Sequence, residues 1–118
     1  MVPLQVIPED WRKAACAVLR KGDTGRTIRW TLDASQRFLA SPDVHSHYEA
    51  YDALIDFLSQ PVCMGCRIVM EKPPGETYEF LMPFRGAPFY GKLLLFPDRK
   101  SVLIFSCHRA LRQKLSCQ

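Results

Sequence analysis

The chain has 118 residues, of which 47% are hydrophobic and 24% are charged. This length fits a single domain, and the composition is that of a folded protein, which excludes wholesale disorder. No apolar run approaches the roughly 18 residues that a membrane span requires, and the first residues lack the pattern of a secretory signal. We therefore expect a cytoplasmic protein without membrane contact.

Charge is distributed unevenly along the chain. The formal net charge is +4, and residues 85–118 carry seven Lys and Arg against one acidic residue, whereas residues 1–84 carry nine against eleven. A cationic last third favours an anionic partner, either a nucleic acid or an acidic protein. A solvated basic surface gives the same pattern, so charge alone leaves both interpretations open.

The first part of the chain, about residues 8–60, predicts helices. A helix runs from Pro8 to Gly22, because acids occupy its first turn, bases its last turn, and apolar residues recur at helical spacing. A short second helix covers residues 31–40 and follows an extended segment at 27–30. A third helix covers His47–Leu58 and ends before Pro61.

The second part, about residues 66–108, predicts strands. Four runs are rich in β-branched and aromatic residues, and turn signals separate them at hairpin spacing: Cys66–Met70, Thr77–Met82, Phe89–Phe96 and Val102–Cys107. We expect one α+β domain over residues 1–118, with two or three helices packed on one face of a roughly four-stranded antiparallel meander. Residues 109–118 form a basic tail, in which Arg109–Leu115 has the composition of a last helical turn.

Five cysteines are an odd number, and without a secretory signal a disulfide framework is not expected. Cys63 and Cys66 have the C-x-x-C spacing of zinc and redox sites. A strand follows them rather than a helix, and Cys107 with His108 is a poor completing pair because neighbouring strand residues point to opposite faces. We favour small, buried cysteines and keep a zinc-bound module as an alternative.

Strand alternation brings several reactive side chains to one sheet face. Tyr90 and Lys92 share a side of their strand, as do Ile104, Ser106 and His108 on the next, while Glu79 lies opposite Tyr78 on an earlier strand. We expect a face that carries Tyr90, Lys92, His108 and Glu79, edged by Arg67, Arg85 and Arg109.

These residue types suit RNA cleavage without a metal or other cofactor. Such a reaction needs a base for the 2′-hydroxyl, a cation for the phosphoryl charge and an acid for the leaving 5′-oxygen. His108 is the natural proton-transfer group, with Glu79 or Tyr90 as a second. The basic residues Lys92, Arg67, Arg85 and Arg109 suit phosphate, and Tyr90 or Phe84 offers a ring for stacking a base.

Each of these residues also has a purely structural interpretation. Tyr90 fits a half-buried strand position, Lys92 fits a solvated strand position, and His108 fits a surface or capping position. Glu79 can form an ion pair with a basic residue on a neighbouring strand. Only the presence of all these residues together, with the cationic last third, favours a catalytic role.

The order of the elements resembles the MqsR-like toxins within the RelE/ParE-like group of bacterial toxin–antitoxin systems. The resemblance rests on Leu19–Gly22, on Arg26–Ala34, on Phe89-Tyr90-Gly91-Lys92-Leu93, and on Ser106-Cys107-His108. It implies a RelE-like α+β fold, messenger-RNA interferase activity in the bacterial cytoplasm and neutralisation by an antitoxin protein.

The resemblance also implies roles for single residues. Tyr90 and Lys92 match the family's Tyr-x-Lys strand, His108 falls at the basic position that closes the final strand, and Arg67 lies near the basic position of the first hairpin strand. The family's glutamine on the second strand is replaced here by the segment Tyr78-Glu79, and its Lys-Ser-Met segment by Cys66-Arg67-Ile68.

Two hypotheses from different classes follow. The first is a toxin-type, metal-independent endoribonuclease that acts on RNA and is neutralised by an antitoxin. The second is a small non-catalytic module of a mobile element that binds nucleic acid or an acidic protein through its basic last third. The sequence is compatible with a monomer or a homodimer.

Overall fold

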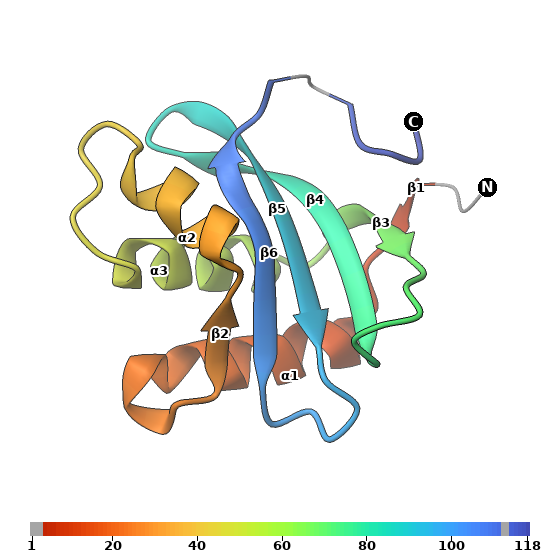
Figure 1. Ribbon diagram of the computed structural model, residues 1–118. Coiled ribbons are helices and arrows are strands. Elements are labelled where there is room, and N and C mark those ends of the chain that lie inside the picture. Colours follow the sequence, from red (N-terminus) through yellow and green to blue (C-terminus); the bar gives the residue numbers. More distant parts are fainter. Residues whose placement is uncertain (1–3, 112–113) are drawn as a thin grey trace.

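A computed structural model describes residues 4–111 and 114–118 of the chain. Three α-helices and a short 3-10 helix pack with one mixed sheet of six strands (Figure 1). The helices are α1 (Glu9–Arg20), η1 (Gly22–Gly25), α2 (Leu32–Leu39) and α3 (Tyr48–Leu58). The broad α+β class is therefore confirmed.

Each helix begins and ends where local chemistry permits. Helix α1 follows Pro8 and carries Glu9 and Asp10 in its first turn, where acids complement the helix dipole. Helix α2 begins after Thr31, whose hydroxyl accepts a hydrogen bond from the backbone N–H of Ala34 at 3.1 Å. Each helix thus starts within two residues of the position that its sequence signals.

The sheet has the strand order β1-β3-β4-β5-β6-β2. Its strands are β1 (Leu4–Val6), β2 (Ile28–Trp30), β3 (Met64–Ile68), β4 (Glu76–Phe84), β5 (Ala87–Leu95) and β6 (Val102–Arg109). The central strands β3 to β6 form the antiparallel meander, β1 pairs antiparallel with β3 at one edge, and β2 pairs parallel with β6 at the other.

The prediction of about four antiparallel strands was wrong in number and in direction. Strands β1 and β2 have three residues each, too few to show an alternating pattern, and both lie outside the predicted sheet region of residues 66–108. Strand β2 follows α1 and enters the sheet beside β6, where Val102 donates a backbone hydrogen bond to Thr27 at 2.9 Å. The expected extended segment at 27–30 is thus an edge strand of the sheet.

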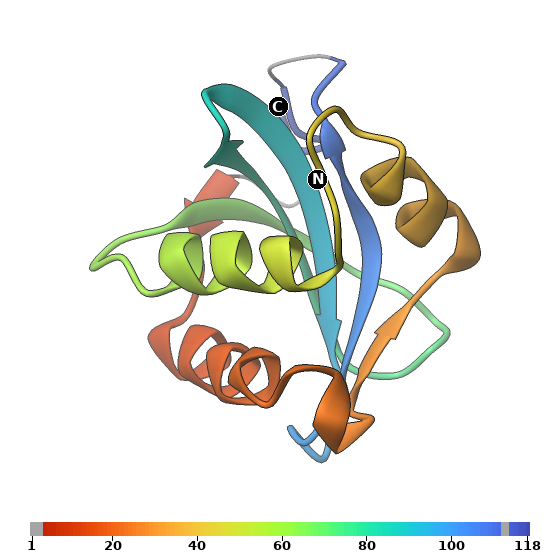
Figure 2. The ribbon, with the colours of Figure 1, turned by 90° about the vertical axis from the view of Figure 1, so that its left-hand side faces the viewer.

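Helices α1 and α3 cover one face of the sheet, and α2 packs against β6 (Figure 2). The main core lies beneath them: Trp11 of α1 meets Tyr78 of β4 edge-to-face at 4.9 Å between ring centroids, and Phe57 of α3 stacks on Phe80 of β4 at 5.1 Å. None of the helices in the described residues lies over the opposite face, and we call it the open face.

Gly91 on β5 is required by this core. A Cβ atom at Gly91 would lie 2.5 Å from Cε2 of the buried Phe80 ring. The absence of a side chain therefore lets β5 pass close to that ring on the covered side of the sheet.

After β6 the chain enters the C-terminal tail, by which we mean the described residues 110, 111 and 114–118. The tail returns across the molecule towards β3, where Cys117 forms a disulfide with Cys66 (Figure 1). The predicted last helical turn at Arg109–Leu115 includes residues 112 and 113, which lie outside the described residues. Among the described residues, no helix has the length and apolar character needed to cross a membrane.

Candidate active site on the open face

Strand register brings together the four side chains predicted to carry chemistry. Tyr90 pairs with His108 and Lys92 pairs with Ser106 across β5 and β6, while Glu79 of β4 pairs with Lys92. Directly paired residues point to the same side of an antiparallel sheet, so Glu79, Tyr90, Lys92 and His108 all project from the open face. Tyr90 and His108 place their ring centroids 5.5 Å apart.

Glu79 is an almost completely buried carboxylate, with 2% of its surface exposed. One carboxylate oxygen accepts a hydrogen bond from the phenol of Tyr90, and the other accepts from the backbone N–H and the hydroxyl of Ser116 in the C-terminal tail. Three donors satisfy the buried charge, as a buried carboxylate requires. In this arrangement Glu79 orients Tyr90 rather than facing solvent.

Tyr90 remains a protonated phenol in this site. Burial, followed by the hydrogen bond to Glu79 and its negative charge, raises the pKa of Tyr90 above its ordinary value. A phenol with a raised pKa donates a proton or a hydrogen bond but is a poor base at neutral pH. The sequence left open proton transfer and base stacking for Tyr90, and if it transfers a proton, this phenol suits the acid rather than the base.

His108 presents one ring nitrogen to the open face. Its Nδ1 lies 2.9 Å from the backbone oxygen of Arg109. A carbonyl oxygen only accepts hydrogen bonds, so Nδ1 carries the proton and Nε2 of the neutral ring keeps a lone pair. A hollow of about 240 Å³ adjoins this ring, lined by Tyr90, His108, Ala110, Leu111 and Lys114. Among the described residues no hydrogen-bond partner is found for Nε2, so the imidazole offers an acceptor next to space for a substrate.

Lys92 lies beside an aromatic ring that the sequence pattern did not place on this face. Its Nζ is 5.3 Å from the ring centroid of Phe105. A β-bulge shifts the register after Lys92, so that Ile104 and Cys107 are buried on the covered face and Phe105 and Ser106 both turn to the open face. The expectation that Ile104 shares a side with His108 was wrong because of this bulge.

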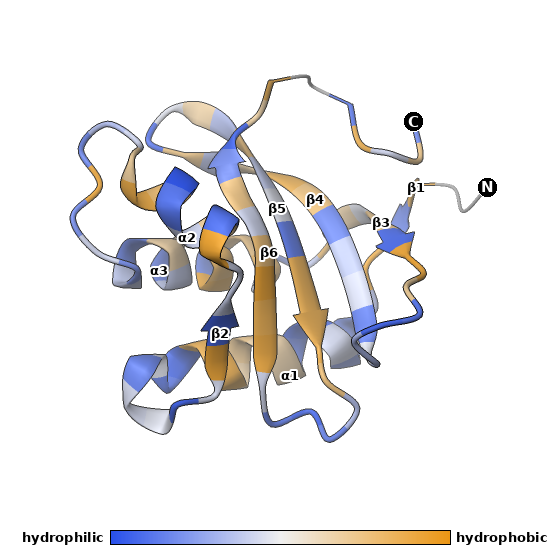
Figure 3. Ribbon diagram, viewed as in Figure 1, coloured by the Kyte–Doolittle hydropathy of each residue, from blue (hydrophilic) through white to orange (hydrophobic). Residues whose placement is uncertain are grey.

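A second cation and ring lie further along the same face. Arg29 of β2 pairs with Leu103 of β6, and its guanidinium lies 5.7 Å from the ring centroid of Phe96. The open face thus carries cations next to aromatic rings, within a sheet whose central strands are otherwise largely hydrophobic (Figure 3). The sequence analysis missed Arg29 because it lies in a three-residue strand, and missed Phe105 because of the bulge.

The three predicted arginines do not edge the open face. Arg67 pairs with Tyr78 and Arg109 pairs with Phe89, and both partners point into the helix-covered side. Arg85 lies in the turn between β4 and β5. Arg67 and Arg109 were expected to edge the open face, but each directly follows a residue of that face, Cys66 and His108, and strand alternation turns it to the other side.

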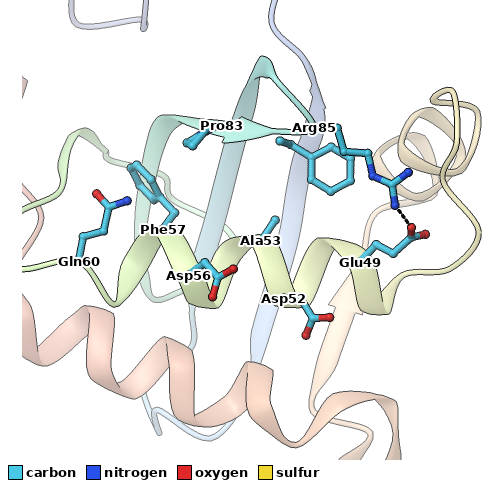
Figure 4. Close-up of a pocket in the computed structure, with 9 residues that line it drawn as sticks. Glu49, Asp52, Ala53, Asp56, Phe57, Gln60, Pro83 and Arg85 are labelled. Atoms are coloured by element: carbon cyan, nitrogen blue, oxygen red, sulfur yellow. Dashed lines mark hydrogen bonds and ion pairs between the residues drawn. The ribbon is translucent and has the colours of Figure 1, made fainter.

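Arg85 is engaged elsewhere. It forms an ion pair with Glu49 of α3 and donates a hydrogen bond to the backbone oxygen of Asp43. It lines a pocket of about 400 Å³ between α3 and the end of β4, into which Glu49, Asp52 and Asp56 bring negative charge (Figure 4). An acid-lined pocket is unsuited to phosphate. Phe84, the other ring considered for base stacking, is buried in contact with Phe38 and Phe89.

The cysteines also differ from expectation. Cys66 is bonded to Cys117, whereas Cys63 is a buried thiol that donates to the backbone oxygen of Phe57 at 2.9 Å. The prediction that disulfides are absent was wrong, because the tail that returns to β3 could not be foreseen from spacing. With its sulfur in a disulfide, Cys66 has no thiolate to share a zinc ion with Cys63.

Comparison with known proteins supplies no relative from which a role can be transferred. No family model matches the chain, and no curated protein or solved structure matches it. The resemblance to MqsR-like toxins therefore stays a prediction, and the function must be argued from the geometry of the open face.

Proposed function

We propose that the protein is a metal-independent endoribonuclease that cleaves single-stranded RNA on the open face of its sheet. One observation carries the proposal: Tyr90 and His108 occupy paired positions of β5 and β6, and Lys92 projects from the same face two residues further along β5. A phenol, an ammonium and an imidazole supply the acid, the cation and the base for attack of a 2′-hydroxyl on its own phosphodiester.

The roles follow from the surroundings of each group. Nε2 of His108 accepts the proton of the 2′-hydroxyl, because Nδ1 is occupied by the backbone oxygen of Arg109. Lys92 neutralises the charge that builds on the phosphoryl oxygens. Tyr90 is held protonated by burial and by Glu79, and its single O–H leaves the Glu79 carboxylate to give its proton to the leaving 5′-oxygen. The products are a 2′,3′-cyclic phosphate and a 5′-hydroxyl end.

The neighbouring rings support a single-stranded substrate. Phe105 lies next to Lys92, and Phe96 lies next to Arg29. Unpaired bases stack on aromatic side chains while cations hold the phosphates, and each stacked base contributes on the order of 1–3 kcal/mol. A duplex hides its base faces, so we expect single strands to be preferred. On the resemblance alone, we further propose that an antitoxin protein neutralises the activity.

The direct test incubates the purified chain with single-stranded RNA in EDTA and identifies the product ends by mass spectrometry. The proposal predicts cleavage with 2′,3′-cyclic phosphate ends. Salt-sensitive RNA binding without cleavage would instead support the non-catalytic nucleic-acid module. Neither binding nor cleavage, in both the oxidised and the reduced protein, would contradict the endoribonuclease and the RNA-binding form of the second hypothesis, and would leave its acidic-protein partner.

A further inference from the structure

The C-terminal tail makes two adjacent contacts with the polar end of the open face. Cys117 is bonded to Cys66 of β3, with their Cα atoms 5.9 Å apart. Ser116, the preceding residue, donates two hydrogen bonds to Glu79, which is the direct cross-strand partner of Cys66. One short stretch of the tail is therefore held at two neighbouring points of the sheet.

These contacts bury Glu79, whose carboxylate orients Tyr90 for the proposed reaction. Leu115 is 5% exposed and Glu79 is 2% exposed, although no helix covers this face. The tail also supplies Ala110, Leu111 and Lys114 to the wall of the hollow beside Tyr90 and His108. The tail thus lies over one side of the candidate site and occupies the carboxylate that orients Tyr90.

Besides the disulfide and the burial of the Leu115 side chain, few hydrogen bonds hold the described part of the tail in this position. Among the described residues 111 and 114–118, the hydrogen bonds to the sheet are the two that Ser116 donates to Glu79. The remaining hydrogen bonds of this segment join Leu115 and Gln118 to each other. A segment with so few links to the fold opens at low cost once its covalent tie is cut.

We propose that the Cys66–Cys117 disulfide is a redox latch: it holds the tail over the candidate active site, and its reduction releases the tail and uncovers Glu79 and Tyr90. That the uncovered site acts on RNA rests on the function proposed above. Release of the tail itself does not, and it can be measured independently of any reaction.

The step needs a thiol reductant, such as a dithiol protein or a small thiol. A thiolate attacks Sγ of Cys117, which is only half-buried, and the Cys66 sulfur leaves as a thiolate that takes up a proton. A second thiolate resolves the mixed disulfide. Two electrons and two protons convert the disulfide into two protein thiols, while two reductant thiols become one disulfide.

The other three cysteines are not candidates for this exchange. Cys16, Cys63 and Cys107 are buried thiols. Burial raises the pKa of Cys107 to about 12, so the reactive thiolate is scarce there at neutral pH. Redox chemistry is therefore confined to the pair that ties down the tail.

Limited trypsin digestion tests the latch without reference to RNA. Oxidised wild type, wild type treated with dithiothreitol, and Cys117→Ser are digested briefly, quenched, fully reduced and analysed by mass for the Leu115–Gln118 peptide. We expect this peptide to appear roughly tenfold faster from the reduced protein and from Cys117→Ser than from the oxidised protein, because local opening exposes the Lys114–Leu115 bond. Dithiothreitol leaves the Cys117→Ser digestion rate unchanged.

Equal digestion rates in all three samples would overturn the latch. Hydrogen exchange of the Ser116 amide gives a second readout: it is slow in the oxidised protein and becomes fast on reduction. Should either reduced form lose its folded circular dichroism spectrum, Ser116→Ala provides a second variant: it removes the hydroxyl donor to Glu79 with the disulfide in place and keeps the backbone N–H donor of residue 116.

Cleavage and binding of RNA then test whether the tail acts as a cover. Reduction is expected to raise RNA cleavage and RNA binding by wild type, and to change neither quantity in Cys117→Ser. A released tail with unchanged RNA binding and cleavage would overturn the covering role. If neither redox state cleaves or binds RNA, the endoribonuclease proposal fails, and the digestion and exchange rates alone decide the latch.

Discussion

Lys92 lies directly opposite Glu79 across β4 and β5, yet the two charged groups turn to different partners. Glu79 accepts hydrogen bonds from Tyr90 and Ser116, while the Lys92 ammonium lies beside the Phe105 ring. None of the ion pairs found among the described residues joins them. The ion pair between Glu79 and a basic residue on a neighbouring strand, considered from the sequence, is therefore not found among the described residues. On the proposed function, the Lys92 charge serves an anionic ligand instead.

The role of Lys92 predicts a separation between activity and stability. Lys92→Ala is expected to lower RNA cleavage by about 10²-fold, as does loss of one group that stabilises transition-state charge. The melting temperature is expected to shift by less than about 2 °C, because a half-exposed lysine without an ion pair adds little stability. Cleavage rates and thermal unfolding of the same preparation measure both effects.

Lys13→Ala is the charge-matched control for Lys92→Ala. Lys13 is exposed on α1, on the covered side of the sheet, where it pairs with Glu9 at 2.9 Å. Cleavage by this variant should equal that of wild type. Parallel loss of fold and activity in Lys92→Ala would show that Lys92 is structural.

His108 is expected to be the base. His108→Ala should lower cleavage by about 10²–10⁴-fold, the usual contribution of a positioned proton-transfer group. Added imidazole should restore part of the activity, because it can enter the hollow that the ring leaves. His45→Ala, in the exposed loop before α3, is the matched control. Full activity of His108→Ala would remove the base from the proposed reaction.

The hydrogen bond between Tyr90 and Glu79 predicts a stability effect. Tyr90→Phe leaves the buried carboxylate with one donor fewer, which costs about 1–3 kcal/mol of unfolding free energy. Urea denaturation measures this loss, with Tyr48→Phe as a control because Tyr48 is 46% exposed and its hydroxyl accepts only an exposed hydrogen bond from the backbone N–H of Asp23. A cost near zero would mean that Glu79 does not depend on the phenol.

The same phenol predicts a pH dependence above neutrality. The pKa of Tyr90 is raised in the folded state, so its contribution to stability is complete below the unfolded value of about 10 and is lost as pH rises from there towards the folded pKa. Wild type should therefore lose more unfolding free energy than Tyr90→Phe between about pH 9 and about pH 11. Parallel pH profiles would show that the phenol is not perturbed by folding.

The positions of the arginines predict which cations are dispensable. Arg67→Ala and Arg85→Ala are each expected to change cleavage by less than about twofold, because one side chain points to the covered side and the other is paired with Glu49. Arg29→Ala, on the open face, should weaken RNA binding and reduce its salt dependence by about one counterion. Cleavage rates test the first two variants, and fluorescence anisotropy with a labelled RNA across a salt series tests Arg29→Ala.

Gly91 predicts a packing effect that is unrelated to charge. Gly91→Ala places a methyl group against Phe80 and is expected to lower the unfolding free energy by about 1–3 kcal/mol. Gly86→Ala is a useful comparison: a methyl group there meets no atom within 4 Å, and only its positive φ of 78° opposes the change. Unchanged stability of Gly91→Ala would show that the Phe80 ring can move aside.

Local patterns were sufficient to predict the parts of the fold that depend on local chemistry. The apolar repeat around Trp11 predicted α1, and strand alternation placed Tyr90 and Lys92 on one face and Phe89 and Leu93 on the other. Strand alternation predicts the direction of each side chain correctly as long as each residue pairs with one residue of the neighbouring strand. It failed at Ile104, because the bulge beside it gives β6 one residue more than β5.

Long-range contacts account for what the sequence could not predict. Strand β1 has three residues and exists because β3 pairs with it. Ser116 and Glu79 are 37 positions apart, and no periodicity connects them. Cys66 and Cys117 are separated by 51 positions, so their pairing depends on the path of the tail after β6. The neighbours of the site, rather than its central residues, were therefore missing from the prediction.

The central claim is that one scissile phosphate sits among Tyr90, Lys92 and His108. The most direct test is an NMR titration of the reduced, isotope-labelled protein with a 2′-O-methyl RNA, which binds without supplying the attacking hydroxyl. We expect the largest chemical-shift changes on these three residues and on Phe105. Changes concentrated instead on α1, on α3 or on the acid-lined pocket beside Arg85 would contradict it.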